Sequence, residues 1–143
     1  TDPSMTRFNI TMNQAVDLIL SAIQKGHGGE VFVPKLKAYR LDILKDAILD
    51  IMGVKLDVEK IPVRSGEKFH ESLINYEELR NTYETDGLYV ILDKQTHHRT
   101  FAKWNNLEKT KTTDSYSSNN VEVLTKEELK EIMTAEFNFK NKN

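Results

Sequence analysis

The stretch Arg64-Ser-Gly-Glu-Lys places a permanent cation and a carboxylate three positions apart, around a glycine. The planar guanidinium of an arginine matches a pair of phosphate oxygens, and a glutamate carboxylate accepts hydrogen bonds from sugar hydroxyls. Gly66 would let the backbone approach a ligand closely. The combination suits a nucleoside diphosphate, with Arg64 on the diphosphate and Glu67 on the ribose. The same spacing is also typical of a solvated surface turn.

Three further motifs accompany this stretch. Met5-Thr-Arg-Phe8 lies near the start of the chain, and Gly29-Glu-Val-Phe-Val-Pro-Lys35 follows it. The Arg64 motif then extends through Phe69 to His70-Glu71. A late stretch, Ser115-Tyr-Ser-Ser-Asn-Asn120, precedes Leu124-Thr-Lys-Glu-Glu-Leu129.

Together, these motifs resemble the C-terminal part of the UDP-N-acetylglucosamine 4,6-dehydratases. Those enzymes belong to the polysaccharide biosynthesis family and are extended short-chain dehydrogenase/reductases. Their pattern is Met-Thr-Arg-Phe, then Gly-Glu-Ile-Phe-Val-Pro-Lys, then Arg-x-Gly-Glu-Lys-x-His-Glu. The resemblance runs from about residue 4 to about residue 133 and is weakest between Asp93 and Thr113.

The resemblance implies a role for five residues. Arg7 and Arg64 would reach the diphosphate of a UDP-sugar, and Glu67 would hold the ribose hydroxyls. Lys68 and His70 also match the motif and are secondary candidates. Lys68 could serve only in a local ion pair, and His70 could be a packed, hydrogen-bonded histidine.

The resemblance also implies a reaction that needs NAD(P). In such enzymes C4 of the hexose is oxidised, water leaves across C5 and C6, and the hydride returns at C6. This chain has no Gly-x-Gly-x-x-Gly loop for a dinucleotide and no tyrosine with a lysine four positions later. We therefore expect NAD(P) and the catalytic residues to belong to an N-terminal Rossmann half that these residues do not include. The isolated chain is expected to be inactive.

The expected partners follow from the same resemblance. They are UDP-N-acetylglucosamine or a related UDP-sugar, the Rossmann half, and further copies of the full-length enzyme in a homo-oligomer. The sequence leaves open NAD against NADP, the stereochemistry at C5 and the identity of the sugar. A different class of function is also open, namely a non-catalytic module that binds a nucleotide sugar or another protein.

Composition excludes several functions. The formal net charge of −2 provides no field to attract nucleic acid or an anionic membrane. The absence of cysteine excludes disulfides and cysteine-based zinc sites and fits an expected cytoplasmic location. No apolar run approaches the roughly 20 residues of a membrane span. No metal site is expected, because adjacent residues such as His97 and His98 point to opposite faces of a strand.

Hydrophobic spacing predicts the elements that position these motifs. A helix is expected from Thr11, as its N-cap, to Gly26, and a second from Leu41 to Met52 with its isoleucines inward. Strands are expected at 30–33, 54–63 and 88–92, a short strand or turn at 71–74, and a short helix at 76–83. A Thr-x-x-Glu capping box at Thr125 and Glu128 predicts a last helix reaching Met133.

Strands that alternate with helices predict an α/β fold, with a small mixed sheet and flanking helices. Residues 1–92 are expected to form the UDP-sugar-binding core. Residues 93–120, which are polar and without period, would form an extended loop or arm. Residues 121–137 would form the C-terminal helix segment, and residues 138–143 a frayed tail.

Overall fold

A computed structural model describes residues 2–59, 61–85, 87–93, 101–104 and 106–137. His97 and His98, residues 94–100 and 105 of the predicted arm, and the tail at 138–143 lie outside these residues. The chain divides into two compact units. Unit 1 contains residues 1–11, 36–71 and 118–143, and unit 2 contains residues 12–35 and 72–117. In the described part of the chain, no helix has the length and apolar character to cross a membrane.

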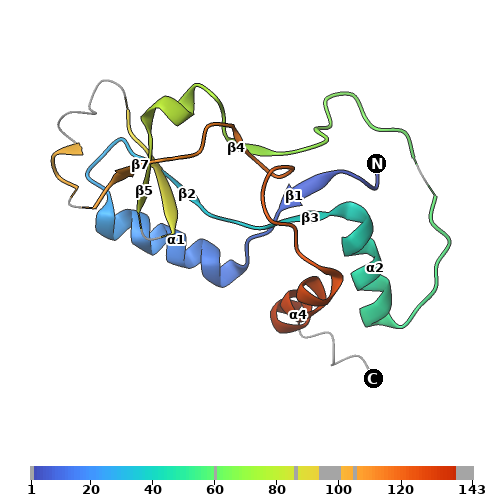
Figure 1. The fold of residues 1–143 in the computed structure, drawn as a ribbon. Coiled ribbons are helices and arrows are strands. Elements are labelled where there is room, and N and C mark those ends of the chain that lie inside the picture. The colour runs from blue at the N-terminus through green and yellow to red at the C-terminus, as the bar shows by residue number, and fades with distance from the viewer. Residues whose placement is uncertain (1, 60, 86, 94–100, 105, 138–143) are drawn as a thin grey trace. The chain divides into compact units, whose positions relative to one another are not determined.

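Unit 2 is built on a four-stranded antiparallel sheet (Figure 1). Its strands run in the order β2 (Val31–Pro34), β6 (Leu88–Ile91), β5 (Thr82–Thr85) and β7 (Glu108–Lys109). Val33 and Val90 are buried on these strands and Leu92 directly after β6, and they form the core with the buried Leu79 of the 3-10 helix η1 (Glu78–Asn81). The β-branched and aromatic residues of β6 favour a strand because they pack well on a pleated, buried surface.

Two further elements complete unit 2. The helix α1 (Met12–Lys25) leads directly into β2 and contacts it. A short ladder pairs β4 (Ser72–Ile74) with β8 (Tyr116–Ser117) in antiparallel fashion, with an irregular register between Ser72 and Ile74. The buried Tyr116 of β8 packs against Tyr89 of β6, with ring centroids 5.0 Å apart.

Unit 1 combines a two-stranded ribbon with two helices. The strand β1 (Thr6–Phe8) pairs with β3 (Ala38–Arg40), and a parallel bridge joins Ala38 to Val123. The helix α2 (Leu41–Met52) packs on α4 (Lys126–Phe137). Their core consists of buried apolar side chains from both helices and the loop before α4, namely Ala47, Leu124, Leu129 and Met133.

The structure confirms the predicted α/β class and most of the predicted elements. The helix α2 has the predicted bounds, and its three isoleucines pack inward around Ala47 as predicted, together with Leu44. The strand predicted at 54–63 is wrong, because the described residues of this segment form no strand and expose their apolar side chains. The helix predicted at 76–83 shortens to η1, because Tyr83 pairs with Val90 in the sheet.

The predicted capping box at the start of α4 is confirmed. The Thr125 backbone N–H donates to Glu128 Oε2 at 2.8 Å, and the Glu128 N–H donates to Thr125 Oγ1 at 3.2 Å. Lys37 Nζ lies 3.0 Å from Glu128 Oε1. The Thr125 N–H, followed by Lys37 and the Thr125 hydroxyl, lowers the pKa of Glu128 from 4.5 to about 2. The negative charge also suits the N-terminus of a helix.

We expect this carboxylate to make the stability of unit 1 depend on acid pH. Because the folded pKa lies below the unfolded value, the contribution of Glu128 is present above about pH 4.5 and is lost as the pH falls to about 2. Glu128→Gln should therefore lower the melting temperature at pH 7, and the difference from the wild type should disappear near pH 2. Circular dichroism melts at several pH values measure this convergence.

A neighbouring variant provides the control for this measurement. Glu127 also lies in the first turn of α4, but no capping bond of Thr125 involves it. Glu127→Gln should thus change the melting temperature less at pH 7. A constant gap between Glu128→Gln and the wild type from pH 7 to pH 2 would contradict the assigned role.

Candidate functional site

Residues Arg64 to Glu67 form a turn that satisfies its own backbone. The Glu67 N–H donates to the Arg64 carbonyl at 3.1 Å, and the Arg64 N–H donates to Glu67 Oε2 at 3.3 Å. Gly66 has a φ of +83° at the third position, which type II turns reserve for glycine. Within the described part of the chain, no hydrogen bond or ion pair holds the Arg64 guanidinium, and the residue is exposed. The turn therefore presents a cation to solvent.

The side chain of Arg7 is held in place on β1. Its Nη1 donates to the carbonyl of Thr6 at 2.7 Å and to that of Phe69 at 3.2 Å, and its Nε lies 3.6 Å from Glu71 Oε1. Its Nη2 has only a 4.0 Å contact with the thioether of Met5 among the described residues. The Arg7 side chain is 22% exposed. Arg7 is thus oriented through Nη1 and Nε, while the N–H groups of Nη2 can still donate to a ligand.

A buried cluster of polar side chains lies beside Arg7. Thr6 Oγ1 is 2.8 Å from His70 Nδ1 and 2.7 Å from Ser118 Oγ. The hydroxyl of Ser118 also accepts from the Glu71 N–H at 2.9 Å, and the Ser118 N–H donates to the Glu71 carbonyl at 2.8 Å. Ser118 is fully buried and Thr6 nearly so. The cluster fixes the segment after the turn onto β1.

These contacts bring some of the predicted site residues together. Arg7 and His70 meet through Thr6 and the backbone at Phe69, two residues after Glu67. His70 is hydrogen-bonded and partly buried. The sequence had left open this packed state and a contact with the ligand. Among the described residues, no hydrogen bond or ion pair joins Arg64 or Lys68 to Arg7. Lys68 is exposed and also has no local ion pair within that part of the chain.

Sequence reasoning missed the residues that position Arg7. Thr6 and Glu71 lie inside the recognised motifs, but their types gave no sign of a shared contact. Ser118 lies in the stretch Ser115 to Asn120. This stretch resembles the dehydratase sequences, but its residue types suggested no role for it. The structure provides that role, because the Ser118 hydroxyl joins the first motif to the Arg64 motif.

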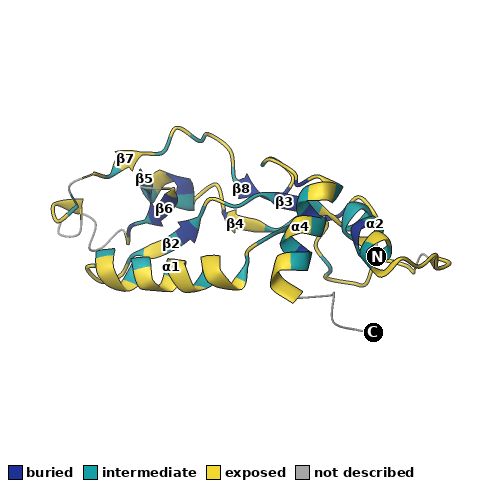
Figure 2. Ribbon diagram, turned by 90° about the horizontal axis from the view of Figure 1, so that it is seen from below, coloured by how far each residue is buried: buried dark blue, intermediate teal, exposed yellow. Residues whose placement is uncertain are grey.

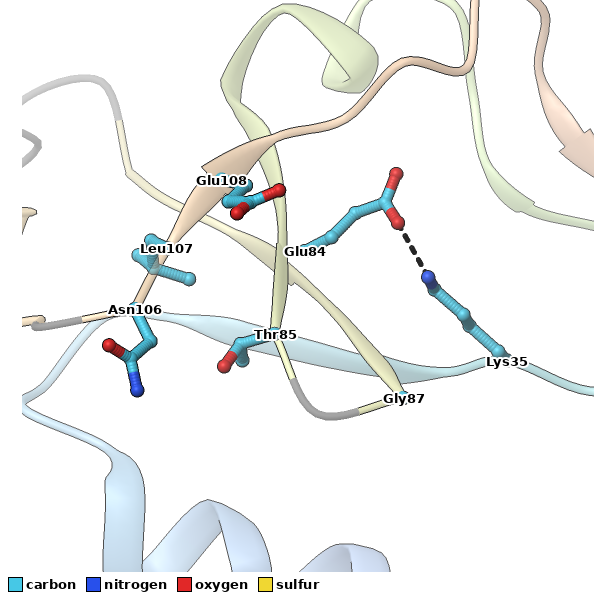
Figure 3. A pocket seen from close by; sticks show the side chains of 7 residues that line it. All are labelled: Lys35, Glu84, Thr85, Gly87, Asn106, Leu107 and Glu108. Atoms are coloured by element: carbon cyan, nitrogen blue, oxygen red, sulfur yellow. Dashed lines mark hydrogen bonds and ion pairs between the residues drawn. The ribbon is translucent and has the colours of Figure 1, made fainter.

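Unit 2 contains an open pocket of about 510 Å³ (Figure 3). Its lining is mostly polar and comes from β5, from β7 and the two residues before it, and from the residues that follow β2 and precede β6, namely Lys35, Glu84, Thr85, Gly87, Asn106, Leu107 and Glu108. Lys35, the last residue of the Val-Phe-Val-Pro-Lys motif, lies 2.5 Å from Glu84 Oε2 and above the ring of Tyr89. Its charge is therefore paired within the unit.

Glu84 is the acidic partner in this pocket. Burial alone would raise the pKa of its carboxyl. The bonds from Lys35 and from the Thr110 hydroxyl, at 2.5 Å each, outweigh burial and lower the pKa below its usual value. The Glu84 carboxyl therefore carries its negative charge at neutral pH.

Comparison with known proteins places these motifs in a family. The profile of the family described as "Polysaccharide biosynthesis protein" matches residues 1–93. Curated relatives named UDP-glucose 4-epimerase include those of Rickettsia felis and Rickettsia prowazekii, which are 35% and 34% identical over 135 residues. Each alignment covers 93% of this chain and 39% of the relative. The chain thus spans about two fifths of the length of these relatives.

A solved structure agrees with this placement. The X-ray structure of Pen from Bacillus thuringiensis superimposes with a TM-score of 0.81 at 26% sequence identity. The superposition covers 96% of this chain and 39% of that chain. The family profile covers well over half of the chain, and the fold agrees along nearly all of it. The chain therefore belongs to the polysaccharide biosynthesis protein family.

Proposed function

We propose that this chain is the UDP-sugar-binding part of a longer NAD(P)-dependent enzyme that modifies the hexose of a UDP-sugar. The observation that carries the proposal is the turn at Arg64. The turn satisfies its own backbone through Glu67, so the Arg64 guanidinium remains exposed for an anion. A diphosphate that links two sugars has about two negative charges, and charge-assisted bonds to arginine are the stronger class of hydrogen bond.

Arg7 supports the proposal from the neighbouring strand. Its contacts to the carbonyl of Phe69 and to Glu71 lock the side chain against the end of the same motif. A preoriented guanidinium loses little side-chain entropy when it binds a ligand. In this proposal Arg7 Nη2 and Arg64 share the diphosphate, and Glu67 accepts from the ribose hydroxyls. Lys68 adds positive charge nearby, and His70 acts only by holding β1 in place.

Two reactions are candidates for the complete enzyme. We favour the 4,6-dehydration of UDP-N-acetylglucosamine, because all four motifs resemble those of such dehydratases. The second candidate is 4-epimerisation, because curated relatives are named UDP-glucose 4-epimerase. Both reactions need the diphosphate and ribose to be fixed so that the hexose is positioned for chemistry, and such positioning is itself a large part of catalysis.

NAD(P) does not fit the residues of this chain. The chain contains no Gly-x-Gly-x-x-Gly loop to cradle a dinucleotide phosphate and no Tyr-x-x-x-Lys pair. We therefore assign the cofactor and the redox chemistry to the part of the complete protein that corresponds to the unmatched length of the relatives. Assembly of that complete protein into a homo-oligomer is part of the same proposal.

A calorimetric titration of UDP-N-acetylglucosamine into this chain tests the binding role. Heat of binding that disappears in Arg64→Ala would support a diphosphate site formed by this chain alone. Absence of binding both here and in the complete protein would refute the proposal and favour an interaction module. Binding only in the complete protein would support a site that the cofactor-binding part completes.

Analysis of products from the complete protein separates the two reactions. A dehydratase converts UDP-N-acetylglucosamine into a product lighter by one water, whereas an epimerase gives a product of unchanged mass. Chromatographic separation of product from substrate followed by mass spectrometry, after incubation with UDP-N-acetylglucosamine and, separately, with UDP-glucose, distinguishes these outcomes. A product of unchanged mass from both substrates would replace our favoured reaction with the second candidate.

A further inference from the structure

The helix α1 exposes a continuous stripe of large apolar side chains. The stripe follows a helical spacing of three and four residues and consists of Met12, Val16, Ile19, Leu20 and Ile23. Met12 and Ile23 are 70% and 72% exposed, and the other three are each 45% exposed or more. Figure 2 shows the predominance of exposed residues along α1. Such a contiguous apolar surface is typical of an interaction site.

The sheet of unit 2 uses a different face of the same helix. The partly buried residues of α1 include Ala15, Leu18 and Ala22, which lie roughly a third of a turn from the centre of the stripe. At the end of α1, Gly26 comes close to the ring of Phe32 on β2. The helix therefore has one apolar face toward its own sheet and a second apolar face, the stripe, that is exposed. A helix with so wide an apolar surface is normally buried on both sides.

The strand β2, which α1 contacts, has a free edge as far as the described residues go. It is the end strand of its sheet and pairs only with β6 among the described residues. The Lys35 N–H donates to the Gly87 carbonyl, and hydrogen-bonded pairs alternate along an antiparallel ladder, so the N–H of Phe32 faces the free edge. Pro34 has no N–H to offer at the next outward position.

The two edges of the sheet are protected differently. The opposite edge strand, β7, is two residues long and consists of Glu108 and Lys109, which are charged. Short, charged edge strands discourage pairing with other chains. The edge at β2 has no charge within Val31–Pro34, and Val31 is 55% exposed. An unguarded edge strand beside an exposed apolar helix face fits a partner that supplies both a strand and an apolar layer.

We propose that the cofactor-binding part of the complete protein docks on this surface, pairing a strand with β2 and covering the stripe on α1. This inference rests on the proposed function, which assigns a dinucleotide-binding part to the complete protein. The curated relatives hold about three fifths of their length outside the match to this chain. A dinucleotide-binding part is an open sheet with helices on its faces, and therefore offers a strand and apolar helices at once.

The double variant Ile19→Gln and Ile23→Gln tests this surface without any ligand. Glutamine keeps the helix propensity but removes the apolar side chains. In the complete protein we expect the melting temperature to fall by about 5–10 °C. In the 143-residue chain the same variant should melt within about 2 °C of the wild type, because both side chains are already exposed. The control is Asn13→Gln with Asp17→Gln on the polar arc of α1, which should leave both proteins unchanged.

Amide hydrogen exchange at β2 provides a second readout. The Phe32 amide should exchange rapidly in the 143-residue chain and be protected in the complete protein, where a partner strand pairs with it. An unchanged melting temperature of the complete protein, or rapid exchange there, would overturn the proposal. A discrete dimer of the 143-residue chain that the isoleucine variant dissolves, with the complete protein unaffected, would assign the surface to a second copy instead. Failure of UDP-sugar binding would leave these readouts intact.

Discussion

Arg64→Ala in the complete enzyme should raise KM for the UDP-sugar by about 10- to 100-fold and leave kcat within a few-fold of the wild type. The expected size is the about 1.5–3 kcal/mol that a hydrogen bond to a charged group contributes. The diphosphate does not react, so Arg64 should bind the ground state and the transition state alike, and such a loss appears in KM. Steady-state kinetics over a wide range of substrate concentration measures both constants.

Two control variants give this experiment its specificity. Arg64→Lys keeps the charge but loses the planar fork, so its KM should lie between those of the wild type and the alanine variant. Arg80 is an exposed arginine of unit 2 whose Nη1 lies 3.6 Å from Glu77 Oε2. Arg80→Ala should leave KM unchanged. Equal KM values for Arg64→Ala and Arg80→Ala would remove Arg64 from the site.

Ser118→Ala should destabilise unit 1 by about 2–3 kcal/mol, which is the cost of leaving buried polar groups without a partner. The hydroxyl of Ser118 accepts from the Glu71 N–H and lies 2.7 Å from Thr6 Oγ1. Without that hydroxyl, its bonds to the Glu71 N–H and to Thr6 Oγ1 are both lost in a region where Ser118 is fully buried. Denaturant unfolding of the 143-residue chain measures the loss.

The same substitution at an exposed serine controls for side-chain deletion. Ser4 bonds to Asp2 at the exposed start of the chain, so Ser4→Ala should change stability by less than about 0.5 kcal/mol. A cycle that combines Ser118→Ala with Thr6→Val should show coupling of about 0.5–3 kcal/mol, since the two side chains share one network. Additive losses would mean that the two hydroxyls act independently, contrary to the structure.

Local patterns predicted the elements whose partners are also local or strongly apolar. The helix α2 has five inward apolar residues at helical spacing and is followed by Gly53, which has a φ of +64°. The apolar spacing and the glycine are both visible in the sequence. The capping box of α4 is likewise contained within four residues. The short strands β1 and β3 were not predicted, because three residues are too few to establish an alternating pattern.

The segment 54–63 shows where such reasoning fails. Its apolar residues alternate as a strand requires, yet Leu56 and Val58 are 65% and 62% exposed and the described residues form no ladder. A strand needs a neighbour for its backbone, and alternation alone does not specify one. The stripe on α1 is a similar case, since its spacing correctly predicts a helix but not which surface covers it.

The candidate site could be predicted as a set of residues but not as an arrangement. The types and spacing of Arg64, Gly66 and Glu67 left open a ligand site and a solvated surface turn, and the φ of Gly66 shows that a turn is present. The contacts of Arg7 could not be predicted, because they depend on Phe69 and Glu71, more than 60 positions away.

The bond between Thr6 and Ser118 also determines the order in which the site can be assembled. The two residues are 112 positions apart, so closing this loop costs on the order of 4 kcal/mol of chain entropy before any contact forms. A ribosome that adds about 5–20 residues per second would release Ser118 roughly 6–20 s after Thr6. Through that interval the Thr6 hydroxyl lacks its bond to Ser118, so the cluster that fixes the segment after the Arg64 turn onto β1 can be completed only after Ser118 has been added.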